Sequence, residues 1–196
     1  MAAPLIELPA PRLAGPMSLE QALAARRSER AFRSDPLTPD EVGQLLWAAQ
    51  GITHPDGLRS APSAGARYPL EVYLASAEGV FHYRPDGHAL EALRPGDIRG
   101  ELCAAALQQE WILEAPVVFV LAAVYERVEA RYGPQRGPRY VHLEAGHAAQ
   151  NLLLQAVALD LGAVVVGAFD DSAVQSALEV PDDHRPLYLI PVGRRR

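Results

Sequence analysis

Apolar residues recur along the chain with two periods, and each period predicts a different kind of element. At Ser18 and again at Thr38 a hydroxyl residue stands three positions before Gln or Glu, a capping box that opens a helix. Apolar residues then follow at helical spacing in both segments, and Gly51 ends the second helix. Residues 70–77 and 80–83 alternate instead, which predicts two strands joined by a turn.

The second half of the chain mixes helices and strands in no strict order. Residues 97–109, 125–132 and 139–161 have helical patterns. The last of these is small or apolar on nearly every side, so we expect it at the centre of the fold or at an interface. A helix that Asp170 or Asp171 caps should follow later. Apolar runs predict the remaining strands, at residues 116–124, 163–169 and 186–192. The mixture predicts an α+β fold.

Two segments show neither period. Residues 1–17 contain four prolines and scattered apolar side chains, which predicts an extended N-terminal arm that lies on another surface. Residues 52–69 are rich in Gly, Pro, Ser and Ala, and a loop of this length in a compact domain is often functional. With 196 residues the chain has the size of one domain, which we expect to comprise residues 18–196.

Composition excludes several classes of function. With 18 basic against 24 acidic residues and a net charge of -6, the broad basic face of a nucleic-acid binder is not expected. All the basic residues are arginine, which cannot form Schiff bases but suits bidentate contacts with anions. The single Cys103 fits a reducing compartment, and no apolar run reaches the roughly 20 residues of a membrane span. We therefore expect a cytoplasmic protein that binds neither nucleic acid nor membranes.

Patterns for metal or hydrolytic chemistry fail on spacing. His142, Glu144 and His147 suggest a metal site, but the two histidines are five residues apart, about 140° round a helix, and the zincin and zinc-deaminase spacings are absent. We expect no metal site, and we interpret His147 as a packed or near-site histidine. Ser63 lacks the glycine two positions earlier that a nucleophile elbow requires, which disfavours serine hydrolysis.

The densest local signal for binding is the arginine-rich segment at residues 26–32. If this segment is extended, Arg26, Ser28 and Arg30 lie on one face because side chains alternate. Two guanidinium groups beside a hydroxyl would make a receptor for phosphate or another delocalised anion. The alternative is that arginines gather at the end of a helix because they complement its dipole.

Several blocks, in this order and spacing, carry a family resemblance. The main blocks are residues 26–32, 61–71 and 167–171, with shorter matches at 45–51, 109–111, 143–147 and 191–193. Together they resemble the nitroreductase family of FMN enzymes, and within it the SagB-type (thiazole/oxazole oxidase-like) dehydrogenases. The resemblance implies a sandwich whose central mixed or antiparallel sheet is flanked by helices. It also implies an intertwined homodimer that holds two FMN molecules at its interface.

The resemblance also assigns roles by position. Arg26 and Ser28 match contacts to the FMN phosphate or ribityl chain, and Arg30 matches the basic residue beside flavin N1, where a cation would stabilise the reduced ring. The stretch that reaches the flavin from the partner subunit is matched by Pro62, Ser63, Ala64 and Gly65. The segment that passes one ring face and donates a backbone hydrogen bond toward N5 is matched by Val165, Gly167 and Ala168.

Two of these matches have simpler interpretations. Gly167 could equally serve a tight turn after a strand. Arg194 matches a basic residue that reaches the phosphate, but residues 194–196 could also form a frayed, solvated tail.

The resemblance implies a ping-pong oxidoreductase, in which NAD(P)H reduces FMN and a nitroaromatic, quinone or similar acceptor takes the electrons. This scheme demands no protein acid or base, so no catalytic residue is assigned. One alternative is an azoline oxidase in peptide modification. Such enzymes share a Lys-Tyr pair where this chain has Arg131 and Tyr132, so the lysine is missing. Another is a flavin-binding dimeric scaffold without activity.

Overall fold

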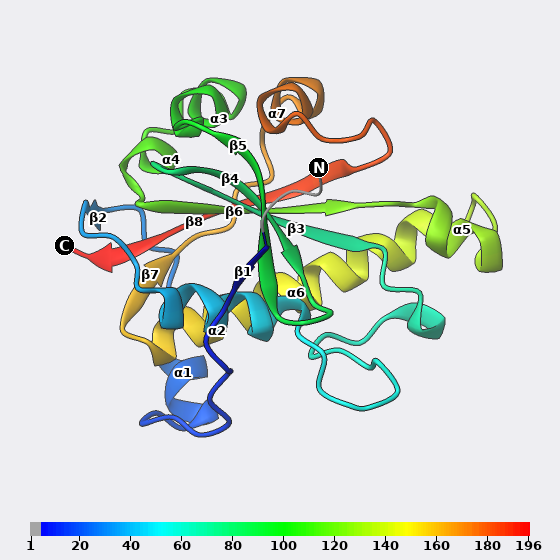
Figure 1. The fold of residues 1–196 in the computed structure, drawn as a ribbon, viewed down its shortest axis with the longest axis horizontal. Coiled ribbons are helices and arrows are strands. Elements are labelled where there is room, and N and C mark those ends of the chain that lie inside the picture. Colours follow the sequence, from blue (N-terminus) through cyan, green and yellow to red (C-terminus); the bar gives the residue numbers. More distant parts are fainter. Residues whose placement is uncertain (1–4) are drawn as a thin grey trace.

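The computed structural model describes residues 5–196, and its centre is one antiparallel β-sheet (Figure 1). The order across the sheet is β1-β5-β4-β3-β6-β8-β2, and β7 also pairs with β8. The strands are β1 (Leu5–Glu7), β2 (Phe32–Arg33), β3 (Leu70–Ser76), β4 (Gly79–Arg84), β5 (Ala89–Pro95), β6 (Val117–Ala123), β7 (Leu161–Ala163) and β8 (Arg185–Arg195).

Helices cover both faces of this sheet, which confirms the α+β prediction (Figure 1). The α-helices are α1 (Leu19–Ala25), α2 (Pro39–Gln50), α3 (Arg99–Ala105), α4 (Trp111–Glu114), α5 (Glu126–Tyr132), α6 (Gly137–Ala158) and α7 (Asp171–Leu178). A 3-10 turn, η1 (Ala64–Ala66), interrupts the long loop before β3.

The alternation of side chains along the strands produces two apolar layers. In β6, Phe119 and Leu121 belong to the core beneath α2 and α6, whereas Val118 and Val120 belong to the core beneath α3 and α7. All four side chains are fully buried. A strand that is apolar at every position is typical of the middle of a sheet covered on both faces.

The predicted helix starts are confirmed by their caps. Ser18 and Thr38 each accept a hydrogen bond from the backbone N–H three residues on, and the Gln21 and Glu41 side chains bond back to the cap backbone. Asp170 caps α7 through its side chain, which accepts a hydrogen bond from the Ala173 N–H.

Two predicted elements are shorter than their sequence patterns. The helix expected at 97–109 ends at Ala105, because Leu107 and Gln108 have positive φ angles that a right-handed helix cannot contain. The strand expected at 163–169 ends at Ala163, and beyond it the chain touches β8 through an isolated bridge between Val166 and Leu189. The Val164 N–H also donates to the Pro191 carbonyl at 3.3 Å, so residues 164–166 still lie beside β8 without forming a regular strand.

Both ends of the described chain join the sheet. Residues 5–7 of the predicted arm form β1, which pairs with β5. The sequence pattern missed β5. Residues 1–4 of the arm lie outside the described residues. At the other end, Arg194 and Arg195 belong to β8 and pair with β2. The interpretation of residues 194–196 as a frayed tail is therefore wrong for these two arginines.

Phe32 should be the residue in β2 that stability depends on most. Its side chain is 1% exposed and packs in a small cluster with Ala115, Val164 and Trp111. Phe32→Ala should lower the free energy of unfolding by about 3–5 kcal/mol, because it leaves a cavity in this cluster. Arg33→Ala, at the exposed neighbouring position, should change it by less than about 1 kcal/mol. Urea denaturation of both variants measures the difference, and equal midpoints would contradict the packing.

Candidate functional site

Residues 26–30 follow α1 as an extended segment that lies beside the end of β7. Ser28 forms a parallel bridge with Ala163, and the Glu29 N–H donates to the Ala163 carbonyl at 3.1 Å. The predicted extended backbone is confirmed, so Arg26 and Arg30 lie on the same face as Ser28.

Arg30 connects this segment to Trp111, at the start of α4. Its guanidinium lies 5.5 Å from the centre of the Trp111 ring, a cation–π distance. The Gln109 side chain, just before α4, donates to the Ala168 carbonyl at 3.1 Å, which holds the segment at residues 164–168 nearby. We call residues 26–30, Trp111 and residues 164–168 the first half-site.

The first half-site has donors suited to an anionic, aromatic ligand. Among the described residues, Arg26 and Arg30 form no ion pair and no side-chain hydrogen bond, so their charges are free to meet a ligand. The Trp111 indole N–H is buried and has no partner in the described chain. A flavin with a phosphate tail fits this set, because phosphate prefers guanidinium groups and an unpaired buried donor is costly.

Arg194 is placed differently from the other predicted contacts. Its guanidinium lies 3.1 Å from the carboxylate of Glu41, in the first turn of α2, and it is half-buried. A phosphate at Arg194 would therefore compete with an existing ion pair.

The predicted loop at Pro62, Ser63, Ala64 and Gly65 lies elsewhere, against α5. Gly65 has a φ of +62°, and a Cβ added there would lie 2.7 Å from the Tyr132 hydroxyl oxygen and 3.2 Å from Arg131. A side chain at this position would have to displace the ends of Tyr132 and Arg131, and the positive φ favours glycine. The loop with Arg131 and Tyr132 is called the second half-site.

Helix α6 separates the two half-sites. Ser63 of the second half-site lies beside Glu144, near the start of α6, whereas Ser28 of the first contacts Ala163, beyond its end. From Glu144 to Ala158 the helix advances about 21 Å at 1.5 Å per residue. Figure 1 shows the same arrangement, with α6 running across the molecule from α5 to β7. One chain thus places its two half-sites at opposite ends.

Glu144 is the least expected polar residue near the second half-site. It is 2% exposed, and neither carboxylate oxygen has a hydrogen-bond partner among the described residues. Burial raises the pKa of Glu144 to about 7, against the lowering influence of Ser63 and Arg59. From the sequence, Glu144 was considered within a family motif and as a metal ligand, not as a buried carboxyl. The available signal was a carboxylate on the apolar stripe that Val141, Ala145 and Ala148 share.

The histidines of α6 do not form a site. His147 is exposed within the single chain, so it is not packed against the described residues, and a place near the site stays a prediction. His142 is hydrogen-bonded to the Tyr125 hydroxyl at 2.7 Å. Within residues 5–196 no group of three or more His, Cys, Asp or Glu side chains is arranged to hold a metal ion. No helix in this part of the chain is long and apolar enough to cross a membrane.

Comparison with known proteins places the chain in a family. The model of the nitroreductase family matches residues 23–194, and the chain belongs to that family. Protein MJ1384 of Methanocaldococcus jannaschii, named as a nitroreductase, is 44% identical over 185 residues, which cover 91% of this chain and 92% of that protein. The family consists of oxidoreductases that usually bind a flavin, are typically dimeric and use a nicotinamide cofactor.

Solved structures agree with the family assignment. A crystal structure from Ralstonia eutropha JMP134, named as a nitroreductase, has a TM-score of 0.90 at 31% identity and covers 98% of this chain and 90% of its own. A chain of the Escherichia coli microcin synthetase McbBCD complex, with truncated pro-MccB17 bound, has a TM-score of 0.74 at 23% identity. It covers 96% of this chain and 76% of its own, and this likeness shows the fold alone.

Glu144 should make stability depend on pH near neutrality. Because the folded-state pKa of this acid is about 7 and its ordinary value is 4.5, folding favours the protonated form, and stability should fall as pH rises from about 4.5 to 7. Glu144→Gln removes this ionisation. The free energy of unfolding of the variant minus that of the wild type should therefore be up to about 3 kcal/mol larger above pH 7 than at pH 4.5. Urea denaturation from pH 5 to 8 measures it. A difference between the two proteins that stays constant with pH would contradict the buried, unpaired carboxyl.

Proposed function

We propose that the protein is an FMN-dependent oxidoreductase, active as a homodimer, in which the first half-site of one subunit and the second half-site of its partner enclose each flavin. Arg26 and Ser28 bind the phosphate or ribityl chain. Val165, Gly167 and Ala168 pass along one ring face, and the small residues Pro62 to Gly65 of the partner approach the other.

The observation that carries the proposal is the separation of the half-sites. Groups in van der Waals contact with opposite faces of a flat ring lie about 7–8 Å apart, twice the optimal carbon–carbon distance. The two half-sites of one chain are about 20 Å apart along α6. They therefore serve different flavins, and a second copy completes each site.

The outer face of α6 supports a paired arrangement. Leu143 is 52% exposed, and no atom lies within 4 Å of a Cβ built at Gly146. Small and apolar residues on an open helical face let a second helix approach closely. The exposed stripe explains why the helix pattern appears apolar on nearly every side although one face points away from this chain's core.

The chemistry follows from charge at the first half-site. A bound flavin supplies hydride acceptance and donation at N5. Arg30 places a cation beside the edge that becomes negative on reduction, and Trp111 holds its guanidinium by cation–π attraction. NAD(P)H and an acceptor such as a nitroaromatic or quinone use the same pocket in turn, in the cytoplasm.

A second candidate keeps the fold and reverses the direction. The position of Tyr132 against Gly65, at the pair that the resemblance links to peptide modification, favours an azoline oxidase acting on a modified peptide. Arg131 stands where such enzymes have lysine, and arginine stays protonated, so it is a poor proton acceptor. We therefore rank this candidate second.

Absorption spectra of the purified protein test the proposal. A flavin spectrum that NADPH or NADH bleaches under argon, and that a quinone or nitroaromatic restores, supports the reductase. Bleaching by an azoline peptide supports the oxidase. A bound flavin that nothing reduces supports a scaffold, and colourless protein that ignores added FMN rejects all three.

Arg26→Ala should weaken FMN binding by about 10- to 100-fold, because a hydrogen bond to a charged group contributes about 1.5–3 kcal/mol. Arg27→Ala is the matched control, since Arg27 turns back to the Ala24 and Arg26 carbonyls. Quenching of FMN fluorescence on titration with protein gives both affinities. If the two variants bind equally well, Arg26 has no role at the phosphate.

Gly146→Glu should convert the dimer to monomers and abolish FMN retention. Within one chain the new side chain meets open space, and glutamate is the better helix former, so the monomer should remain folded. Light scattering after gel filtration measures the mass, and circular dichroism verifies the helix content. A Gly146→Glu dimer that retains FMN would place the interface elsewhere.

A further inference from the structure

We propose that Arg127 and Glu71 are positioning residues that hold residues 63–68 in the shape that lets the second half-site meet the flavin. This inference rests on the proposed function, because it assigns the loop its role there. Neither residue is among the predicted flavin contacts.

The loop has an unfavourable backbone that needs external support. Gly65, Ala66 and Tyr68 have φ angles of +62°, +53° and +45°. Ala66 and Tyr68 lack the freedom of glycine in this region, and such residues persist only where surrounding contacts hold them. Within the loop the Tyr68 N–H donates to the Ser63 hydroxyl at 2.9 Å, which joins its two ends.

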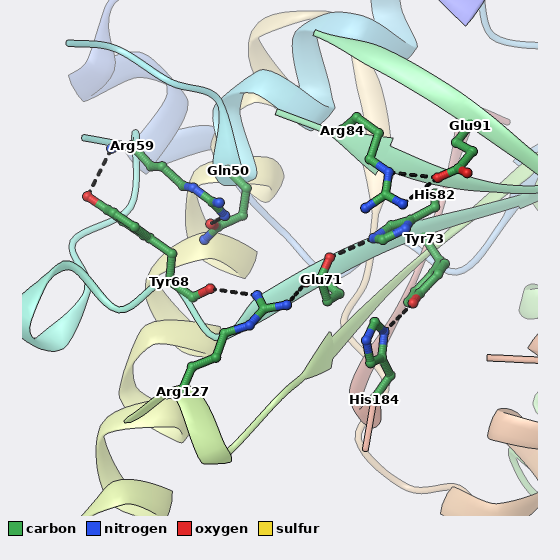
Figure 2. Close-up of polar contacts among 10 residues, drawn as sticks. All are labelled: Gln50, Arg59, Tyr68, Glu71, Tyr73, His82, Arg84, Glu91, Arg127 and His184. Carbon is green, nitrogen blue, oxygen red and sulfur yellow. Dashed lines mark hydrogen bonds and ion pairs between the residues drawn. The ribbon is translucent and has the colours of Figure 1, made fainter. Parts of the chain in front are cut away.

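Arg127 ties this loop to the sheet (Figure 2). One amino group of its guanidinium donates to the Tyr68 carbonyl at 3.1 Å, and the other forms an ion pair with Glu71 of β3. On the far side, His82 Nε2 of β4 donates to the second oxygen of Glu71 at 2.6 Å. The chain of contacts runs from the middle of the sheet, through one carboxylate and one guanidinium, to the strained residue Tyr68.

Glu71 can serve as the fixed end of this chain. Its side chain is 12% exposed, and although burial raises its pKa, the hydrogen bond from His82 and the charge of Arg127 lower the pKa to about 2. The carboxylate therefore stays ionised at any pH above about 4. A buried carboxylate with two fixed partners keeps its position, and Arg127 keeps its position through it.

A neighbouring ion pair offers a matched control. Glu71 and Arg127 line a cavity of about 470 Å³, and Arg84 and Glu91 line it too. Arg84 Nη2 lies 2.5 Å from a Glu91 oxygen, and Figure 2 shows Arg84 beside His82. Neither partner contacts the loop in the interactions that we observe. Loss of this pair should affect the sheet surface as loss of the Arg127 pair does, without releasing Tyr68.

The experiment compares Arg127→Met and Glu71→Gln with Arg84→Met in two assays. Arg127→Met keeps the aliphatic stem, and since Arg127 is partly exposed it should fold even if Glu71→Gln does not. The first assay measures FMN affinity by fluorescence titration. The second exposes flavin-free protein to trypsin and follows cleavage after Arg67, inside the loop, by mass spectrometry.

We expect Arg127→Met and Glu71→Gln to bind FMN about tenfold more weakly and to be cut after Arg67 several times faster than wild type, whereas Arg84→Met should match wild type in both assays. Arg127→Lys should recover part of both effects. Equal affinity and equal cleavage in all variants overturn the positioning role. If wild type binds no FMN, the proposed function fails, and the cleavage assay still decides whether Arg127 and Glu71 hold the loop.

Discussion

A rigid helix through the protein sets the spacing on which the proposed site depends. Helix α6 has 22 residues and spans about 33 Å, with Glu144 and the small-residue loop near its first turns and Ser28 beyond its last. Because it packs on the sheet through a continuous apolar face, its length cannot adjust to bring the two groups together. In the proposed dimer, two chains pair across their α6 helices, so that each end of one helix meets the opposite end of its partner.

The polar residues divide into those that face a ligand and those that hold the ligand-facing residues. Arg26 and Arg30 form no ion pair within residues 5–196, and Arg30 lies over the Trp111 ring, so both charges remain available to an anion. Arg127 forms an ion pair with Glu71 and a hydrogen bond with the loop backbone, so these two residues stabilise the conformation of the loop rather than contact a ligand. Glu144 belongs to neither group. An unpaired buried acid costs stability, and such costs often accompany functional sites.

Local patterns in the sequence predicted many of the helices and strands. Capping boxes and alternation depend on neighbours a few residues apart, so the first two helices and the β3–β4 pair were predictable. Strand β5 pairs with β4 across a short turn, but its residues are mostly Ala, Leu and Glu, which do not favour strands, so the pattern missed it. The bridge between Val166 and Leu189 joins residues of two separate segments, which no local pattern encodes. At the site, resemblance found the motifs, but the stacking of Arg30 on Trp111 and the tie between Arg127 and Tyr68 required the structure.

The most direct test of the shared site mixes two defective chains. One carries Arg26→Ala with Arg30→Ala, which removes the first half-site, and the other carries Gly65→Val, which should distort the second. Each homodimer then lacks every intact site, whereas a heterodimer purified through two different affinity tags has one. The account predicts one FMN bound per heterodimer and none per homodimer. A heterodimer without FMN, beside wild type that binds it, would show that each flavin lies within a single chain.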